Sequence, residues 1–198
     1  MGFSLLILSV AVAVLVGWGV GIYNRLVTAR NQYRNAFAQI EVQLQRRFDL
    51  IPNLVEIAKG YLKHERETLE AVIAARGAAV AGLAHARAHP GEAGPMASLA
   101  ATQGQLEGAL GRLLVVAEAY PELKANQNMM QLTEELTSTE NKVAFARQAY
   151  NDAVLAYNNR REVFPGSLIA GNFRFMPAAL LDIPVDKSHV REAPAISF

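Results

Sequence analysis

The stretch from Glu41 to Glu70 reads EVQLQRRFDLIPNLVEIAKGYLKHERETLE and joins two amphipathic helical patterns at residues 49–53, DLIPN. Upstream, apolar residues recur in steps of three and four, which is typical of a helix with one buried face. The same stepping resumes downstream at Ile51 and continues to Ala79. Two helical patterns therefore meet at this segment.

Pro52 decides how these patterns are joined. A proline inside a helix removes one hydrogen bond and clashes with the carbonyl four residues earlier, at a cost of about 3 kcal/mol. The apolar phase alone is compatible with a kinked continuation. However, an unbroken helix from Arg25 to Arg87 would be about 90 Å long, and its apolar stripe would lie unburied. We therefore predict a turn at Asp49 to Asn53, because Asp and Asn bond local backbone and Pro suits a helix start.

The rest of the body adds two further helical patterns. A loop rich in Gly and Pro at residues 89–95 precedes a helix over 96–117, which ends at Tyr120-Pro121. A long helix over 123–157 follows and is closed by Phe164-Pro165-Gly166. Four helices with short connections predict an all-α, antiparallel, up-and-down four-helix bundle behind an N-terminal transmembrane helix.

The C-terminal segment differs from the body. Residues 167–198 are apolar but contain Pro177, Pro184 and Pro194, so a long helix is excluded. We predict an irregular strap that lies on the bundle, with disorder from about Lys187. The predicted domains are thus a transmembrane anchor (1–24), a helical bundle (25–166) and a C-terminal tail (167–198).

The N-terminus indicates a membrane anchor. No charged residue occurs from Met1 to Asn24, and the stretch 3–22 supplies the roughly 20 apolar positions that cross a hydrocarbon core. A cleaved signal peptide is the alternative, but no basic residue precedes the apolar run. Arg25, Arg30 and Arg34 follow it, so the positive-inside rule places the bundle in the cytoplasm and the short N-terminus outside.

Gly17 and Gly21 form a small-xxx-small pair within the anchor. Such a pair lets two membrane helices approach closely, which makes homo-oligomerisation one interpretation. The alternative is that glycine is simply frequent in membrane helices.

Composition excludes several function classes. The 198 residues carry a formal net charge of +1, so no global field attracts nucleic acid. The chain has no cysteine, which excludes disulfides, thiolate metal sites and cysteine nucleophiles.

Catalytic and metal-binding patterns are absent from the sequence. His85 and His89 have the i, i+4 spacing of a metal-binding pair, but Pro90 follows and the one nearby acid is Glu92, so a solvated pair is favoured. No nucleophile elbow, phosphate loop or dinucleotide fingerprint occurs. We predict no catalytic residue, no metal and no cofactor.

Glu140 lies close to the apolar stripe of the last helix, where a charge needs a partner. Counting about 1.5 Å per residue from the predicted turns places it level with Arg30 and Arg34. We expect a structural ion pair with these arginines. A solvated Glu140 is the alternative.

The predicted turns suggest a partner-binding surface. Both would lie at the end of the bundle away from the membrane, where exposed loops often carry function. The alternative is that these residues merely cap the core. The predicted docking residues are Asp49, Leu50, Pro52, Asn53, Tyr120 and Pro121.

Several motifs together resemble the LemA family of bacterial membrane proteins. They are RRFDLIPNLVE (46–56), YPELKA (120–125), ELTSTENKVA (135–144) and the pairs Tyr150-Asn151 and Tyr157-Asn158. The resemblance implies a single membrane helix in the bacterial inner membrane and a cytoplasmic four-helix bundle. It implies no established reaction; some members are associated with membrane metalloproteases of the HtpX type, and a relative acts in magnetosome membrane formation.

The expected function is that of a membrane-anchored scaffold that presents its bundle to protein partners. A regulator of a membrane protease or of envelope stress is one alternative. A metal-binding or enzymatic bundle is another.

Overall fold

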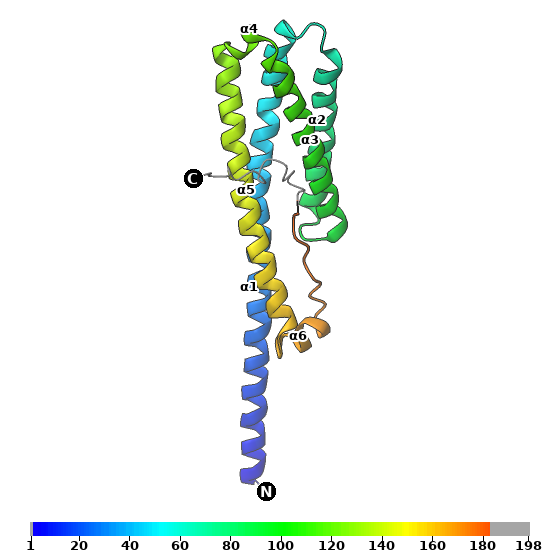
Figure 1. Cartoon of the computed structure of the whole chain (residues 1–198). Coiled ribbons are helices and arrows are strands. Elements are labelled where there is room, and N and C mark those ends of the chain that lie inside the picture. The colour runs from blue at the N-terminus through cyan, green and yellow to red at the C-terminus, as the bar shows by residue number, and fades with distance from the viewer. Residues whose placement is uncertain (1, 183–198) are drawn as a thin grey trace, which may run out of the picture.

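The computed structural model describes residues 2–182, which fold entirely into helices and connecting segments (Figure 1). The helices are α1 (Gly2–Tyr61), α2 (Arg66–Ala88), α3 (Ala93–Glu118), α4 (Pro121–Lys124), α5 (Gln127–Glu162) and α6 (Gly166–Asn172). The expected all-helical class is confirmed for this part of the chain. The expected disorder beyond Lys187 lies outside the described residues.

The predicted turn at Asp49 to Asn53 is wrong, because α1 continues through Pro52 as one helix. The chain turns back at residues 62–65 instead. There the backbone N–H of Leu62 donates to the Ala58 carbonyl at 2.8 Å, and that of Glu65 donates to the Leu62 carbonyl at 3.1 Å. The predicted boundary between residues 24 and 25 also falls inside α1, with no break in the helix.

The helix tolerates Pro52 because another helix supplies the missing donor. Proline has no N–H, so the Phe48 carbonyl loses its usual partner four residues ahead. The Arg76 side chain of α2 fills this gap, since its Nε donates to the Phe48 oxygen at 2.7 Å. The proline itself is exposed, so its ring meets solvent and not the core.

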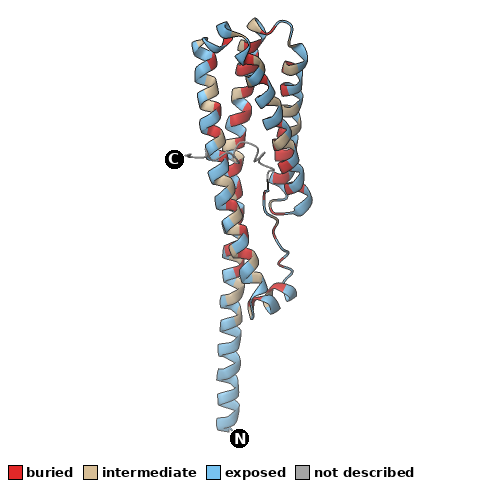
Figure 2. Cartoon of the chain, in the orientation of Figure 1, coloured by how far each residue is buried: buried red, intermediate tan, exposed pale blue. Residues whose placement is uncertain are grey.

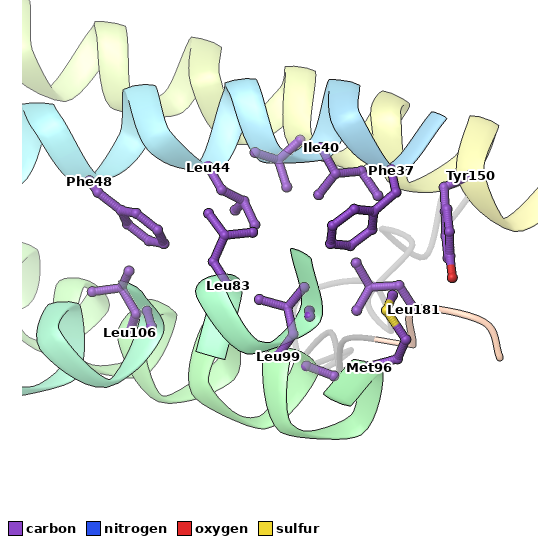
Figure 3. Packing of buried hydrophobic residues seen from close by; sticks show 14 of the residues in the cluster. Phe37, Ile40, Leu44, Phe48, Leu83, Met96, Leu99, Leu106, Tyr150 and Leu181 are labelled. Carbon is purple, nitrogen blue, oxygen red and sulfur yellow. The ribbon is translucent and has the colours of Figure 1, made fainter. Parts of the chain in front are cut away.

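One continuous stripe of α1 forms the spine of the core. Its buried apolar residues run from Leu26 to Ala58 in steps of three and four. α5 packs along this stripe, and α2 covers part of it. Figure 3 shows α1 side chains facing residues of α2, α3, α5 and the C-terminal segment: Phe37, Ile40, Leu44 and Phe48 opposite Leu83, Met96, Leu99, Leu106, Tyr150 and Leu181.

The predicted four-helix bundle is confirmed only as an all-helical fold. α1 packs against α5 and α2, and α2 packs against α3, with successive long helices running in opposite directions (Figure 1). No comparable packing joins α3 to α5, and a groove separates them. The α2–α3 hairpin is also shorter than the α1–α5 pair, so it covers only the end of the molecule away from the N-terminus.

The C-terminal strap begins at Phe173, because Gly166–Asn172 form α6. Two asparagines of α5 bind the strap backbone as a neighbouring strand would. Asn158 donates to the Ala178 carbonyl at 2.8 Å and accepts from the Ala178 N–H at 3.0 Å. Asn151 makes the same pair of bonds to Leu181, at 3.3 and 2.9 Å.

Two tyrosines reinforce this ladder. The Tyr157 hydroxyl donates to the Met176 carbonyl at 2.7 Å, and that of Tyr150 donates to Ala179 at 2.8 Å. Burial raises the pKa of both phenols, and the neighbouring Tyr33 adds to the effect, so both remain donors at neutral pH. The strap thus holds α5 along its second half.

Gly91 connects the strap to the α2–α3 loop. Its carbonyl accepts from the Ala179 N–H at 2.8 Å. Its φ is +87°, and a Cβ there would lie 3.0 Å from the Tyr33 ring, so a side chain fits neither the backbone nor the space.

Most of the N-terminal third of α1 projects beyond every other element, and only its last turns lie beside α6 (Figure 2). It contains an 18-residue window of mean hydropathy 2.5, none of which is buried, so it is a candidate membrane span. α2 also meets the length and hydropathy criteria, but a third of its window is buried in the protein.

We predict that Arg76→Met lowers the free energy of unfolding by about 1–3 kcal/mol, because it leaves the Phe48 carbonyl without a donor. In a Pro52→Ala background the residue 52 N–H bonds that carbonyl again, so the same substitution should cost less than half as much. Urea unfolding followed by circular dichroism measures both values. Arg66→Met is the control, since its pair with Glu70 is exposed. Equal costs in both backgrounds would contradict the assignment.

Candidate functional site

The groove between α3 and α5 is the candidate site. The half of the groove further from the N-terminus has a volume of about 740 Å³, and the half nearer to the N-terminus has a volume of about 450 Å³. The two halves are continuous, since both are lined by Leu114, Thr133, Thr137 and Asn141. The groove is therefore long and open along two antiparallel helices.

Most of the surface that lines the half of the groove nearest α4 is apolar. Leu114 and Ala117 come from α3, and Met129 and Met130 come from the first turn of α5. Asn126 fixes this turn, because its Oδ1 accepts from the Met129 N–H at 3.1 Å. Met130 is 52% exposed, which leaves its flexible thioether free to pack against an incoming surface.

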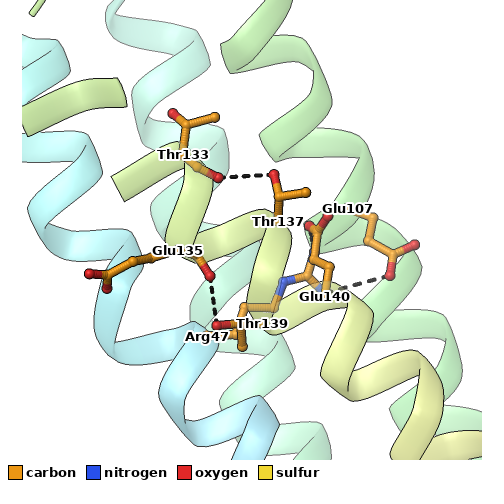
Figure 4. A network of polar contacts seen from close by, with 7 residues as sticks. All are labelled: Arg47, Glu107, Thr133, Glu135, Thr137, Thr139 and Glu140. Carbon is orange, nitrogen blue, oxygen red and sulfur yellow. Dashed lines mark hydrogen bonds and ion pairs between the residues drawn. The ribbon is translucent and has the colours of Figure 1, made fainter. Parts of the chain in front are cut away.

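A buried arginine lies at the bottom of the other half. Arg47 of α1 is 1% exposed, and its Nη2 lies 2.8 Å from Glu140 Oε1 of α5. Its Nη1 lies 3.5 Å from Glu107 Oε1 of α3 (Figure 4). One guanidinium therefore joins three helices below the groove. Its Nε has no protein partner and is buried.

The two glutamates share this single cation at the groove wall, and each remains about 40% exposed. Burial raises the pKa of the Glu140 carboxyl; Arg47 opposes the rise, and Glu107 adds to it. One negative charge is thus enough to balance Arg47, and the second is held at an electrostatic cost.

The threonines of the groove already use their hydroxyl protons. Thr133 donates to the Met129 carbonyl at 2.8 Å, and Thr137 donates to the Thr133 carbonyl at 2.9 Å. These bonds leave methyl groups and acceptor oxygens for other contacts. Among residues 2–182, no group of three or more His, Cys, Asp or Glu side chains is placed to hold a metal ion. What the groove offers chemically is an apolar surface with a charged wall.

The ion pair expected for Glu140 is formed with a different arginine. Its partner is Arg47, and neither Arg30 nor Arg34 is within ion-pair distance. Arg30 lies instead over the Phe175 ring, 5.0 Å from its centroid. Arg47 is 13 residues beyond Arg34, which is about 20 Å along a helix.

Glu140 pairs with a later arginine than expected because the turn after α1 lies later than predicted. The turn begins at Leu62 and not at Asp49, which is also 13 residues later. The α1 residue that lies beside any given residue of α5 is therefore 13 positions later than predicted.

The predicted docking residues are brought together only in part. Asp49, Pro52 and Asn53 are exposed along the side of α1, and Leu50 is half-buried there. None of these four lies at the end of the molecule, and their binding of a partner stays a prediction.

Tyr120 and Pro121 do lie at the end of the molecule away from the N-terminus, where α4 begins. The Tyr120 hydroxyl is 3.5 Å from Glu65 Oε1, and Asn126 Nδ2 donates to the Tyr61 hydroxyl at 3.0 Å. These contacts join the α1–α2 turn to the segment around α4. This end of the molecule, which we call the tip, therefore consists of residues 62–65 and 120–126.

Gly17 and Gly21 are exposed on the projecting part of α1, and a Cβ added at either position would have open space around it to 4 Å. The face that they form is open. Self-association through it stays a prediction.

The residue that sequence reasoning overlooks is Arg47. It occupies a position of the apolar stripe between Leu44 and Ile51, which is where a charge needs a buried partner. The position of Arg47 within the apolar repeat is the sequence signal that could have identified it. The two Tyr-Asn pairs, which are seven residues apart, likewise share one face of α5.

We predict that Glu107→Gln and Glu140→Gln each change the free energy of unfolding by less than about 1 kcal/mol, because one carboxylate still balances Arg47. The double substitution removes both and leaves a buried, unbalanced guanidinium, at a cost of about 3 kcal/mol or more. Urea unfolding gives all three values. The control is Glu118→Gln with Glu134→Gln, an exposed pair on the same helices. If the free-energy changes of the two single substitutions add up to that of the double substitution, Glu107 and Glu140 do not share Arg47.

The pKa of Glu140 predicts a pH dependence. Because the pKa is higher in the folded chain than in the unfolded chain, the contribution to stability is fully present below the unfolded pKa. It is lost as the pH rises through the folded pKa. The unfolding free energy of the wild type minus that of Glu140→Gln should therefore fall as the pH rises above about 4. A difference that rises for Glu140→Gln would refute the assignment.

Curated proteins supply three informative relatives. Magnetosome protein MamQ 2 of Paramagnetospirillum magneticum is 26% identical over 163 residues, which is 75% of this chain and 60% of that protein. Magnetosome protein MamQ of Magnetospirillum gryphiswaldense is 24% identical with the same coverage. Protein LemA of Metamycoplasma hominis is 23% identical over 178 residues, which is 87% of this chain and 77% of that protein.

The chain therefore spans about 60% of the length of the MamQ proteins that it matches. Neither MamQ nor LemA is the name of a known enzyme. A family model described as the LemA family matches residues 36–198, which include α1 from Ala36 onward and all of α2 to α6. With most of its length matched in this way, the chain belongs to the LemA family.

Proposed function

We propose that this protein is a membrane-anchored interaction protein that receives an amphipathic helix of a protein partner in the groove between α3 and α5. The observation that carries the proposal is the apolar, methionine-lined groove of about 740 Å³ at the end of the molecule away from the N-terminal span. In this proposal α1, α2, α3 and α5 form a four-helix bundle with one open side.

Membrane anchoring is supported by the projecting part of α1. Twenty residues, 3–22, give a helix of about 30 Å, which equals the thickness of a hydrocarbon core. The arginines at positions 25, 30 and 34 follow the span, and no charged side chain precedes it. This asymmetry favours a bacterial inner-membrane protein with a cytoplasmic body and a short N-terminus outside.

A partner helix is supported by the shape and lining of the groove. Two antiparallel helical walls with an apolar floor fit the apolar face of a third helix, with anchors at i, i+3, i+4 and i+7. Glu118, Lys124 and Glu134 line its rim and supply both signs of charge for register. Tyr120 and Pro121 lie between the lining residues Glu118 and Lys124 in the sequence but do not themselves line the groove.

A scaffold and a regulator of a membrane protease would use the same groove. They differ in the identity of the bound protein. The partner captured at the groove therefore distinguishes them.

We predict that a photo-crosslinking amino acid at Met130 gives a discrete adduct in native membranes, whereas the same group at Phe145 does not. Both side chains are exposed on α5, at 52% and 73%, but Phe145 is not part of the groove lining. Thr137→Arg should remove the adduct by filling the groove with a charged side chain. Mass spectrometry then identifies the partner.

Two outcomes would overturn this proposal. One is an adduct of equal yield from Phe145 or one that survives Thr137→Arg. The other is an adduct that consists of two copies of this chain.

A further inference from the structure

We propose that α6 and the C-terminal end of α5 form a second membrane-contacting element, which lies in the headgroup region beside the N-terminal span and binds anionic phospholipid. The proposal rests on the membrane anchoring of α1. It adds a lipid-binding surface that is separate from the groove between α3 and α5.

The position of α6 along α1 sets its depth. Tyr23 packs edge-on against Phe173, with ring centroids 5.0 Å apart. Ile169 and Phe173 also line a shallow apolar groove of about 330 Å³ together with Val16 and Val20 of the span. Figure 1 shows α6 beside this part of α1, with the rest of the span projecting further.

If residues 3–22 span a membrane, the part of α1 beside α6 lies within that membrane. Residues 16–22 are the last two turns of the apolar stretch 3–22, and they cover about 9–10 Å of its length. Interfacial helices bury their apolar faces by about 5–10 Å at the boundary between headgroups and acyl chains. A bilayer that surrounds the span therefore also meets α6.

The surface of this region is apolar where it would meet lipid. Single exposed apolar residues are common, but a cluster within 14 residues marks an interaction surface. The exposed side chains are Val163 at 64%, Phe164 at 72%, Leu168 at 59%, Phe173 at 60% and Met176 at 71%. Since the cluster continues the lipid-facing surface of α1, lipid is the occupant that fits it.

The charges around the cluster suit an anionic headgroup. Residues 159–178 contain Arg160, Arg161 and Arg174 against one acid, Glu162, which pairs with Arg161 at 3.0 Å. Residues 2–40 contain three arginines and no acid. Basic side chains near a membrane surface attract anionic lipids.

One groove combines both features. It has a volume of about 330 Å³ and lies between α1 and the end of α5, with Ile22, Leu26, Val163 and Phe164 among its lining residues. Arg25 and Arg160 also line it. Apolar walls for an acyl chain beside two guanidinium groups for a phosphate are the chemistry of a phospholipid site.

The chain has no cysteine, so single cysteines report on each region of the full-length protein. An environment-sensitive fluorophore is attached at Leu168→Cys in α6, at Val12→Cys in the span and at Val115→Cys in α3, which is also an exposed apolar position. The protein is reconstituted into phosphatidylcholine vesicles with spin-labelled lipids, with and without phosphatidylglycerol. Circular dichroism confirms that each variant is folded.

We expect spin-labelled lipid to quench the fluorophore at positions 12 and 168 at least about twofold more than at position 115. Phosphatidylglycerol should increase the quenching at position 168, and Arg160→Gln with Arg174→Gln should remove that increase. Arg112→Gln, an exposed arginine of α3, should not.

The outcomes separate this proposal from the anchoring on which it rests. Quenching at position 12 without quenching at position 168 overturns the α6 proposal and leaves the anchor intact. Absence of quenching at position 12 overturns the anchor as well. Shielding at position 168 that disappears on dilution with unlabelled protein assigns the surface to a second copy and also overturns the proposal. Quenching at position 168 that does not depend on phosphatidylglycerol overturns the preference for anionic lipid.

Discussion

The hydrogen bond from Arg76 to the Phe48 carbonyl stabilises α1 as one continuous helix, and most of the molecule packs on that helix. With α1 unbroken to Tyr61, the part of it beyond the candidate span matches the 36-residue α5 in length, so the two helices bury each other from end to end. The same continuity sets Arg47 opposite Glu107 and Glu140. A turn at Pro52 would have left α5 without a partner over a third of its length.

The helical class and the ends of α3 and α5 could be predicted from local pattern, because Pro121, Pro165 and the Gly-Pro loop at 89–95 act on their own neighbours. The turn after α1 could not. A proline inside a helix is tolerated or not according to whether a distant side chain replaces the missing N–H, and Arg76 is 28 residues from Phe48. Local signals at Gly60 and the polar run 63–67 were present but weaker than a proline.

For the candidate site, the sequence identified the need of Glu140 for a cation, but it assigned the wrong arginine. Pairing across helices depends on register, so one misplaced turn moved the expected partner by 13 residues. The groove itself has no sequence signature, because it arises from helices that fail to meet. The strap was expected, yet its attachment through Asn151 and Asn158 requires knowing where an extended chain lies on a helix.

The separation of α1 and α5 along the chain has a consequence for biosynthesis. About 100 residues lie between the end of α1 and the end of α5. At roughly 5–20 residues per second, the ribosome needs roughly 5–20 s to complete the second helix after the first. During that interval the apolar stripe from Leu26 to Ala58 is without its main partner. Nascent chains of this protein are therefore expected to need a chaperone or the bilayer surface to shield α1.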